Sequence, residues 1–362
     1  MTATITGLGG WIPPNVVTND DLCAVLDSTD EWIRTRTGIR ERRMVSGGLS
    51  TRDLAVEAGR RALKSAGESA GESAGESVAD AVVVATTSPD RICPAVAPEV
   101  ASLLGLREVP AFDLTSACSG FVYGLATAGG LIASGVADRV LFIGAEAFTT
   151  LVNPADRATA PIFGDGAGAV VLRRGAADEP GALGPFDLGS DGALADLLAI
   201  PGGGSRQRSA SAALGHDGLG HDGLGHGGLG HGAVPTADWY LRMEGRPLYT
   251  QAVERMSASA RSVLDRVGWS VDDVDWFVGH QANVRIVRAV AEELGVPEER
   301  VPVNIDRVGN TLAASIPLLL NDTAQRGDLK PGDRVLLSAF GAGLSWGSTV
   351  LTWPDISVES VE

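Results

Sequence analysis

The chain has 362 residues, enough for one large domain or two ordinary ones, and a formal net charge of −16. So acidic a chain is repelled by phosphate backbones, which disfavours nonspecific binding to nucleic acid. Its three scattered cysteines exclude a disulfide framework, and the sequence shows neither a secretory leader nor an apolar run of membrane-spanning length. We therefore expect a cytoplasmic protein that binds neither nucleic acid nor membrane.

The first half of the chain alternates helical and strand patterns, as in an α/β protein. Thr18 and Ser50 each precede an acidic residue, which is typical of helix N-caps. The uninterrupted apolar run at 81–86 is typical of a strand covered on both faces. In chain order we expect a strand at 4–9, helical pieces over 18–36, a helix over 50–66, a strand at 81–86, a helix near 96–105, a strand at 109–113, a helix over 117–135, and strands at 139–144 and 169–172.

The second half repeats this order. The tetrapeptide Asp-Arg-Val-Leu at 138–141 recurs at 333–336, and Asp80 and Asp275 have the same separation; Asp113 and Asp306 have nearly the same one. We infer two duplicated halves, residues 1–175 and 176–362, that face each other across a pseudo-dyad. In this half we expect helices over 247–267, 283–294 and 311–326, and strands at 274–278, 301–305, 334–339 and 348–352.

Two low-complexity segments interrupt the pattern. Residues 66–77 repeat Ala-Gly-Glu-Ser without an apolar face and are expected to form an exposed linker loop. Residues 205–235 are expected to be a disordered insertion rich in Gly and His. A backbone so rich in Gly does not hold ligands at fixed geometry, so we expect no defined metal site there. The histidines of this tract are His216, His221, His226 and His231.

Cys118 is the first candidate for chemistry. It lies between the strand expected at 109–113 and the helix expected over 117–135, near a helix N-terminus. Unpaired N–H groups and the helix dipole stabilise a thiolate at such a position, which suits a nucleophile. The alternative is a buried structural cysteine, which is common for a free thiol.

His280 and Asn310 are two further candidates. His280 is the one histidine outside the glycine-rich tract, and it follows the strand expected at 274–278. Under the duplication, the helix that begins after Asn310 corresponds to the helix that begins near Cys118. A thiol, an imidazole and a carboxamide then converge from three remote parts of the chain. A core histidine and an asparagine helix cap are the structural alternatives, but the joint placement favours function.

Five short motifs occur in the chain in a characteristic order. They are Ala-Cys-Ser-Gly-Phe at 117–121, Phe-Gly-Asp-Gly-Ala-Gly at 163–168, Gly-His-Gln-Ala-Asn at 279–283, Gly-Asn-Thr at 309–311 and Phe-Gly-Ala-Gly at 340–343. Together they resemble the β-ketoacyl-acyl-carrier-protein synthase III family, the condensing-enzyme branch of the thiolase fold, over about residues 3–354. The resemblance implies a thiolase-like five-layered αβαβα fold of the α/β class and a homodimer.

The resemblance also implies a mechanism that uses no cofactor, with a coenzyme A thioester as substrate. Cys118 takes an acyl group from acyl-CoA, and His280 with Asn310 hydrogen-bonds the thioester carbonyl of malonyl-acyl carrier protein. Loss of CO₂ leaves an enolate, which attacks the acyl-Cys118 carbonyl to initiate a fatty-acid or polyketide chain. The backbone N–H groups of Cys118 and Ala342 are implied as the oxyanion hole.

Binding residues are implied by the same resemblance. Trp32 matches a residue that stacks on the adenine of coenzyme A, with Arg36 and Arg157 as neighbouring cations, Asn283 lining the pantetheine tunnel and Arg285 docking the acidic carrier protein. Residues 34–43 hold five Arg against one Glu. They form either a patch for a phosphorylated or acidic partner, as the resemblance implies, or a solvated surface segment.

Two positions depart from the family pattern. Cys93, before Pro94, stands where a bulky Phe often caps the acyl pocket across the dimer, which puts strict acetyl selectivity in doubt. Arg246-Pro247 stands where the usual motif has Asn-Glu. Both departures favour a starter-unit enzyme of a specialised polyketide or related pathway over housekeeping fatty-acid initiation.

Two other functions would use the same residues. An acyltransferase on this scaffold would move the acyl group of Cys118 to an alcohol or amine without condensation, with His280 as general base. A non-catalytic protein would only sense acyl-CoA in the pocket.

Overall fold

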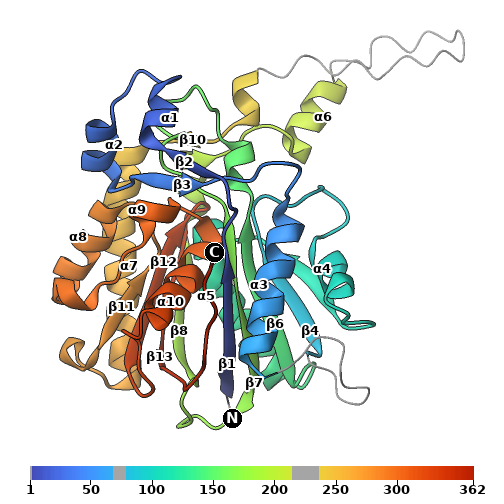
Figure 1. Cartoon of the computed structure of the whole chain (residues 1–362), viewed down its shortest axis with the longest axis vertical. Helices are drawn as coiled ribbons and strands as arrows, with labels where there is room; N and C mark the ends of the chain where they lie inside the picture. Colours follow the sequence, from blue (N-terminus) through green and yellow to red (C-terminus); the bar gives the residue numbers. More distant parts are fainter. Residues whose placement is uncertain (1, 68–78, 214–235) are drawn as a thin grey trace, which may run out of the picture.

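Two large mixed sheets form the centre of the molecule, for which a computed structural model describes residues 2–67, 79–213 and 236–362 (Figure 1). In the first, β4, β5 and β6 are parallel, and β7 runs antiparallel to both β6 and β1. In the second, β11 and β12 are parallel, and β13 runs antiparallel to both β12 and β8. The first sheet has the order β1 (Thr2–Trp11), β7 (Gly166–Gly175), β6 (Arg139–Glu146), β4 (Ala81–Ala85), β5 (Ala111–Leu114), and the second the order β11 (Trp276–Gly279), β12 (Arg334–Gly341), β13 (Ser345–Thr352), β8 (Leu183–Ser190).

Helices cover both faces of each sheet. Three apolar cores lie between the layers: one joins the outer helices to the first sheet, one joins the outer helices to the second sheet, and one fills the space between the sheets. From left to right, Figure 1 shows the order helix, second sheet, helix, first sheet, helix. This confirms the predicted five-layered fold. The outer helices are α3 (Thr51–Ser65) and α4 (Ala97–Leu103) on the first sheet and α7 (Gly245–Val267) and α8 (Val284–Leu294) on the second; the central ones are α5 (Gly120–Ala133) and α10 (Ser315–Gln325).

Small residues let the central helix α5 approach the sheets closely. A Cβ added at Gly124 would lie 1.9 Å from the ring of Phe142 in β6, so any larger side chain there would displace the ring. Phe142 instead stacks on Phe121 of α5, with ring centroids 5.3 Å apart. The N-terminal end of α5, which follows Cys118 directly after Ser119, is therefore fixed by packing between the two sheets.

Matching hydrogen bonds support the predicted duplication. The N–H of Asp80 donates to the carbonyl of Arg139 (2.8 Å), and the N–H of Arg139 donates back to the Asp80 carboxylate (2.9 Å). In the second half Asp275 and Arg334 exchange the same two bonds, at 2.9 and 2.8 Å. The strands that these residues begin, β6 and β12, occupy equivalent places in their sheets.

The turns before the two central helices also match, whereas one of the three sequence anchors was wrong. Ala117 and Leu312 have nearly equal positive φ values, 44° and 47°, at the start of short 3-10 helices. These helices are η1 (Ala117–Ser119) and η8 (Leu312–Ala314). Asp113 and Asp306 are not equivalent, because Asp113 lies in β5 and Asp306 lies in the short helix α9 (Ile305–Val308).

The strand expected at 301–305 is absent from the described structure. Residues 301–304 have no regular secondary structure, and α9 begins at Ile305. Pro302 has no N–H group for a sheet ladder. The N–H of Asn304 donates to the side chain of Gln281 (3.4 Å) rather than to a neighbouring strand. Every other predicted element is present, with its ends shifted by a few residues.

The edge strand β8 and the helix α6 (Ser205–Ala213) were not predicted. Glycines and Pro185 interrupt the strand pattern of β8, and Pro185 is tolerated because β8 lies at the sheet edge. The expectation of disorder from residue 205 onward was wrong for 205–213, whose Ser, Arg, Gln and Ala residues favour a helix over the glycine-rich repeat that follows. The expected linker at 68–77 and the repeat at 214–235 lie outside the described residues.

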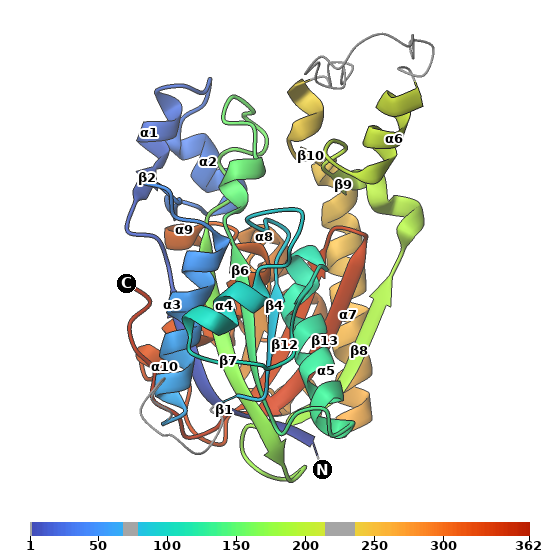
Figure 2. The same cartoon turned by 90° about the vertical axis from the view of Figure 1, so that its right-hand side faces the viewer.

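Shorter elements gather at one end of the sheets, the upper end in Figures 1 and 2. An apolar cluster that includes Cys118, Phe148 and Phe163 joins this end to the sheets. The elements are β2 (Val16–Thr18), α1 (Asn19–Cys23), α2 (Asp30–Thr37), β3 (Glu41–Arg43), β9 (Leu198–Ala199) and β10 (Arg242–Met243).

Candidate active site

Two cavities meet at Cys118. The first, which we call the entry cavity, has a volume of about 730 Å³ and is lined by Cys118, His280 and Asn310 together with residues of α7 and α8. The second, which we call the inner cavity, has a volume of about 510 Å³ and is also lined by Cys118. Phe163 and Leu198 line both cavities. A group bound to the sulfur therefore has open space on two sides.

Cys118 lies where the sequence predicted, in η1 between β5 and α5. The main chain of Gly341 presses against it, since a Cβ at Gly341 would lie 2.7 Å from the Cys118 nitrogen. Burial raises the pKa of the Cys118 thiol, and the nearby Glu146 carboxylate raises it further. Burial therefore acts against the thiolate expected at the helix N-terminus, which stays a prediction.

His280 directly follows β11, and its ring is buried. Its Nδ1 is 2.6 Å from Oγ of Ser315 in α10, and that oxygen also accepts the N–H of Gln281 (3.2 Å). The Ser315 hydroxyl hydrogen is then available to Nδ1, so we assign the imidazole proton to Nε2. Burial lowers the pKa of His280 to about 3, which keeps the ring neutral. Nε2 has no partner among the described residues.

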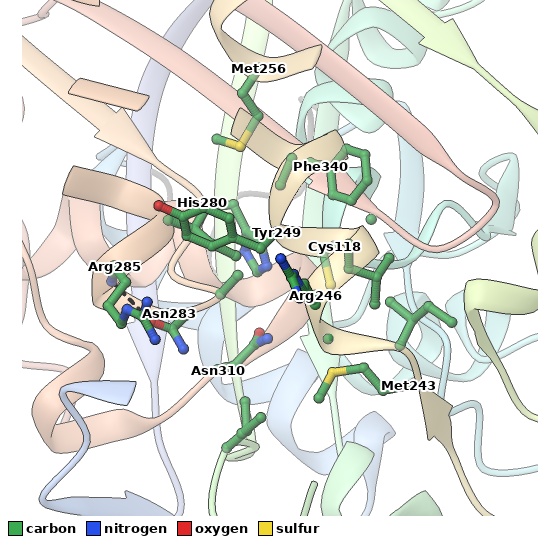
Figure 3. Close-up of a pocket in the computed structure, with 18 of the residues that line it drawn as sticks. Cys118, Met243, Arg246, Tyr249, Met256, His280, Asn283, Arg285, Asn310 and Phe340 are labelled. Atoms are coloured by element: carbon green, nitrogen blue, oxygen red, sulfur yellow. Dashed lines mark hydrogen bonds between the residues drawn. The ribbon is translucent and has the colours of Figure 1, made fainter. Parts of the chain in front are cut away.

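Asn310 is held by hydrogen bonds from both its main chain and its side chain. Its N–H donates to the carbonyl of Ile162 (2.9 Å), and its carbonyl accepts the N–H of Gly164 (3.0 Å). Its side-chain Oδ1 accepts the N–H of Leu312 at 3.0 Å, which leaves the Nδ2 amide as a donor. Figure 3 shows the side chains of Cys118, His280 and Asn310 around one space, from three different elements.

Arginines surround the mouth of the entry cavity. Arg36 and Arg157 lie over the ring of Trp32, with guanidinium carbons 5.6 and 4.5 Å from its centroid. Arg246 and Arg285 line the cavity wall, as does Arg36. None of these four arginines forms an ion pair within residues 2–67, 79–213 and 236–362, so their charges are available to an anionic ligand.

Asn283 joins two elements of this mouth. Its side chain caps α8 by accepting the N–H of Arg285 (2.9 Å) and donates to the carbonyl of Arg36 in α2 (3.0 Å). The Arg285 guanidinium lies 5.9 Å from the centroid of Tyr249. Of the predicted binding residues, Arg36, Asn283 and Arg285 thus line the entry cavity. Trp32 and Arg157 do not line it, but Trp32 lies next to Arg36 and Arg157 lies over Trp32.

Ala342 and Cys93 differ in their relation to the sulfur. Ala342 lines the inner cavity beside Cys118, as a residue of the predicted oxyanion hole should. Cys93 is exposed and is not among the lining residues of either cavity. Its neighbour Ile92 lines the inner cavity instead.

Two polar residues beside the site were missed in the sequence. Ser315 orients His280, but its role depends on the packing of α10 against β11, which local sequence does not reveal. Glu146 is fully buried, accepts bonds from the Thr87 N–H (3.0 Å) and the Ser88 hydroxyl (2.6 Å), and has its pKa raised by burial to about 7. A carboxylate at the end of an otherwise apolar strand was the available signal.

No group of three or more His, Cys, Asp or Glu side chains in the described part of the chain is placed to hold a metal ion. None of the helices described is both long and apolar enough to cross a membrane.

Two family models match the sequence. The model for 3-oxoacyl-[acyl-carrier-protein] synthase III matches residues 112–192, and the model for the C-terminal part of this enzyme matches residues 264–353. The β-ketoacyl-[acyl-carrier-protein] synthase III 3 of Streptomyces coelicolor is 54% identical over 354 residues, which cover 98% of this chain and 98% of that protein. The chain belongs to the synthase III family.

Solved structures of synthase III proteins share its fold. The enzyme from Pseudomonas aeruginosa PAO1 is 47% identical, with a TM-score of 0.85 over 99% of this chain and 100% of that chain. The priming β-ketosynthase from the R1128 polyketide biosynthetic pathway is 34% identical, with a TM-score of 0.83 over 98% of this chain and 97% of that chain. These findings confirm the family predicted from the five motifs and its thiolase fold.

Proposed function

We infer that this synthase III chain condenses an acyl-CoA primer with malonyl-acyl carrier protein and so initiates fatty-acid or polyketide chains. The observation that carries this inference is the meeting of one thiol and two neutral hydrogen-bond donors at a single cavity: Cys118, Nε2 of His280 and Nδ2 of Asn310.

The first step is acyl transfer to Cys118. The sulfur attacks the carbonyl carbon of acyl-CoA, and backbone N–H groups of Cys118 and Ala342 stabilise the oxyanion that forms. The carbon–sulfur bond to coenzyme A then breaks, and coenzyme A leaves as a thiol with the proton that Cys118 carried. One thioester is exchanged for another. Because the pKa of the resting Cys118 thiol is raised, its proton is still present at the start of the step and passes to the leaving group.

The second step is decarboxylation of the malonyl group. Nε2–H of His280 and Nδ2–H of Asn310 donate to the malonyl thioester oxygen. The bond to the terminal carboxylate breaks, CO₂ leaves, and its electron pair forms an enolate whose negative oxygen the two donors stabilise. Because the ring of His280 stays neutral at physiological pH, it stabilises the enolate without protonating it.

The third step forms the carbon–carbon bond. The enolate carbon attacks the acyl-Cys118 carbonyl, whose oxyanion uses the same backbone donors. Collapse of this intermediate expels the Cys118 thiolate, which takes a proton from solvent, and releases a β-ketoacyl-carrier protein. The protein acts as an acyltransferase of the condensing type, and the coenzyme A thioester is its substrate rather than a resident cofactor.

The rim residues suit both substrates. In this proposal Trp32 stacks on the adenine, Arg36 and Arg157 meet the phosphates, and Asn283 lines the pantetheine path. Arg285 attracts the acidic carrier protein, in support of which its guanidinium stands free of carboxylates in the described structure. Arg246 adds a further cation to the same wall.

A homodimer is the assembly that we propose. The edge strand β5 has no strand partner on its outer side within the described sheet, and its residues are half-buried. An unpaired edge of this kind can extend its sheet across a two-fold axis. Cys93 is exposed, and its loop is joined to this strand because the N–H of Val96 donates to the Asp113 carboxylate (2.7 Å). In the proposed dimer Cys93 would act as the acyl-pocket gate of the partner subunit.

We further propose that the enzyme serves a specialised polyketide or related pathway. The small Cys93 and the unusual Arg246-Pro247 depart from the family pattern in the parts that meet acyl group and carrier. The likeness to a polyketide priming enzyme supports a starter-unit role.

A product assay tests the proposal. The protein is incubated with a panel of acyl-CoA primers and malonyl-carrier protein, and CO₂ release, the carrier product and the mass of the protein are measured. We expect CO₂, a β-ketoacyl product and an acyl adduct that Cys118→Ala abolishes. Acyl transfer to an alcohol or amine without CO₂ would favour the acyltransferase alternative, and an unmodified wild-type chain would favour an acyl-CoA sensor.

A further inference from the structure

We propose that the primer of this enzyme is an uncharged medium-chain acyl group, whose hydrocarbon chain occupies the inner cavity. This inference rests on the proposed function, because it concerns the acyl group that Cys118 carries. It extends that function by naming the class of primer.

The position of the inner cavity makes it the place for the acyl chain. Arg36, Arg246, Arg285 and Asn283 line the entry cavity, so coenzyme A reaches the sulfur from that side. The inner cavity begins at Cys118 and Ala342. Apart from Cys118, the two cavities share only Phe163 and Leu198 among their lining residues. A chain attached to Sγ of Cys118 therefore has a separate space beyond the sulfur.

The size of this space exceeds the need of a two-carbon primer. Its volume is about 510 Å³. An apolar protein cavity of about 150 Å³ holds a benzene molecule, which has six carbons, so a cavity about three times as large holds a chain of about eight to ten carbons with space to spare. An acetyl group would leave most of it empty.

The walls of the inner cavity select hydrocarbon. No charged side chain lines it among the described residues, and its polar members are confined to Thr87, Ser88 and Thr150. A carboxylated or otherwise charged primer would thus lose its hydration without gaining a partner. The apolar lining comes from Phe148, Leu151, Phe163, Leu198, Ile200, Trp239, Leu241 and Leu312.

One wall of the inner cavity, which we call its far end, is formed by two glycines and a tryptophan. Gly202 and Gly203 face Trp239, and the N–H of Gly202 donates to the carbonyl of Asp238 at 2.7 Å. Both Trp239 and Ile92 line the cavity, and they are 48% and 76% exposed in the single chain. Exposed apolar side chains of this size mark a surface that the partner subunit of the proposed homodimer would cover, which would close the cavity around the acyl chain.

The test compares the rates at which acyl-CoA primers acylate Cys118. Acetyl-, butyryl-, octanoyl- and decanoyl-CoA are presented to the full chain, and coenzyme A release and intact mass give kcat/KM for acylation. Each buried methylene is worth up to about fourfold in affinity. We expect octanoyl-CoA to react at least tenfold faster than acetyl-CoA.

Two variants at the cavity sharpen the test. Ala199→Phe places a ring in the inner cavity and should lower the octanoyl-to-acetyl ratio at least tenfold. Trp239→Ala removes bulk at the far end and should shift the preference toward decanoyl-CoA, which keeps the test valid should the first variant fail to fold. Val136→Phe, at a residue 55% exposed outside both cavities, is the matched control and should leave the ratio unchanged.

A wild-type preference for acetyl-CoA, or a ratio unaffected by both cavity variants, would overturn the medium-chain inference while acyl transfer to Cys118 stands. Absence of an adduct with every primer would instead overturn the proposed function.

Discussion

The two halves of the fold use the same kind of turn to position two different groups, a thiol in the first half and a carboxamide in the second. In the first half the positive-φ turn at Ala117 presents the thiol of Cys118, and in the second the matching turn at Leu312 fixes the amide of Asn310. Burial acts on both halves, raising the pKa of the thiol and lowering that of His280. Both groups are therefore neutral in the resting site, which teaches that the duplicated frame supplies position while each half supplies its own chemistry.

If His280 and Asn310 serve only decarboxylation, loss of one of them should separate acylation of Cys118 from condensation. Asn310→Ala deletes one of the two enolate donors, and we expect condensation to fall by about 10²–10³-fold. Acylation of Cys118 should change little. Stopped-flow acylation and CO₂ release, measured on the same preparation, check this; equal losses in both would contradict the division between the halves.

The opposite pKa directions can be tested by pH. Because burial raises the thiol pKa, alkylation of Cys118 by a small neutral reagent should speed up about tenfold per pH unit, or about 100-fold from pH 6.5 to 8.5. Over the same range His280, with its pKa near 3, should stay neutral and show no titration by NMR. An alkylation rate that is already constant at pH 7 would show that the thiol ionises early.

Ser315 lies on α10 and holds the imidazole of His280 at the end of β11, so both partners of this contact belong to the second half. Ser315→Ala removes the bond to Nδ1 and frees the ring to change tautomer, so we expect about a tenfold loss of condensation. Ser315→Thr should restore much of it, since a hydroxyl remains. The kcat of CO₂ release is the readout, and an unchanged kcat with a raised KM would assign Ser315 to binding instead of orientation.

The smallest effect is expected at the rim. Arg285→Ala should raise KM for malonyl-carrier protein about threefold and flatten its dependence on salt, because an exposed cation acts mainly on association. Arg60→Ala, at an exposed α3 arginine paired with Glu57, is the matched control and should leave KM unchanged. A kcat loss in Arg285→Ala would place this residue nearer the chemistry.

Sequence patterns predicted the layers and the three site residues because each depends on local signals. Apolar runs marked the buried strands. Cys118 and His280 each follow a strand, and Asn310 lies between α9 and η8. The strand expected at 301–305 failed because tertiary pairing, and not local propensity, decides whether an extended segment joins a sheet.

Other features arise only from packing. The raised pKa of Cys118 reflects burial by remote segments, which a local helix-dipole argument does not include. The inner cavity is walled by irregular residues near 198–203 and 239–241, which have no periodicity to read. Ser315 joined the site through a contact across 35 positions of sequence.

The most direct test of the account is His280→Ala treated with acyl-CoA and with malonyl-carrier protein labelled in the free carboxylate. Protein mass and labelled CO₂ are measured in one sample. The account predicts a full acyl adduct on Cys118 and CO₂ release reduced by about 10² or more. Loss of the adduct, or CO₂ release at the wild-type rate, would contradict it.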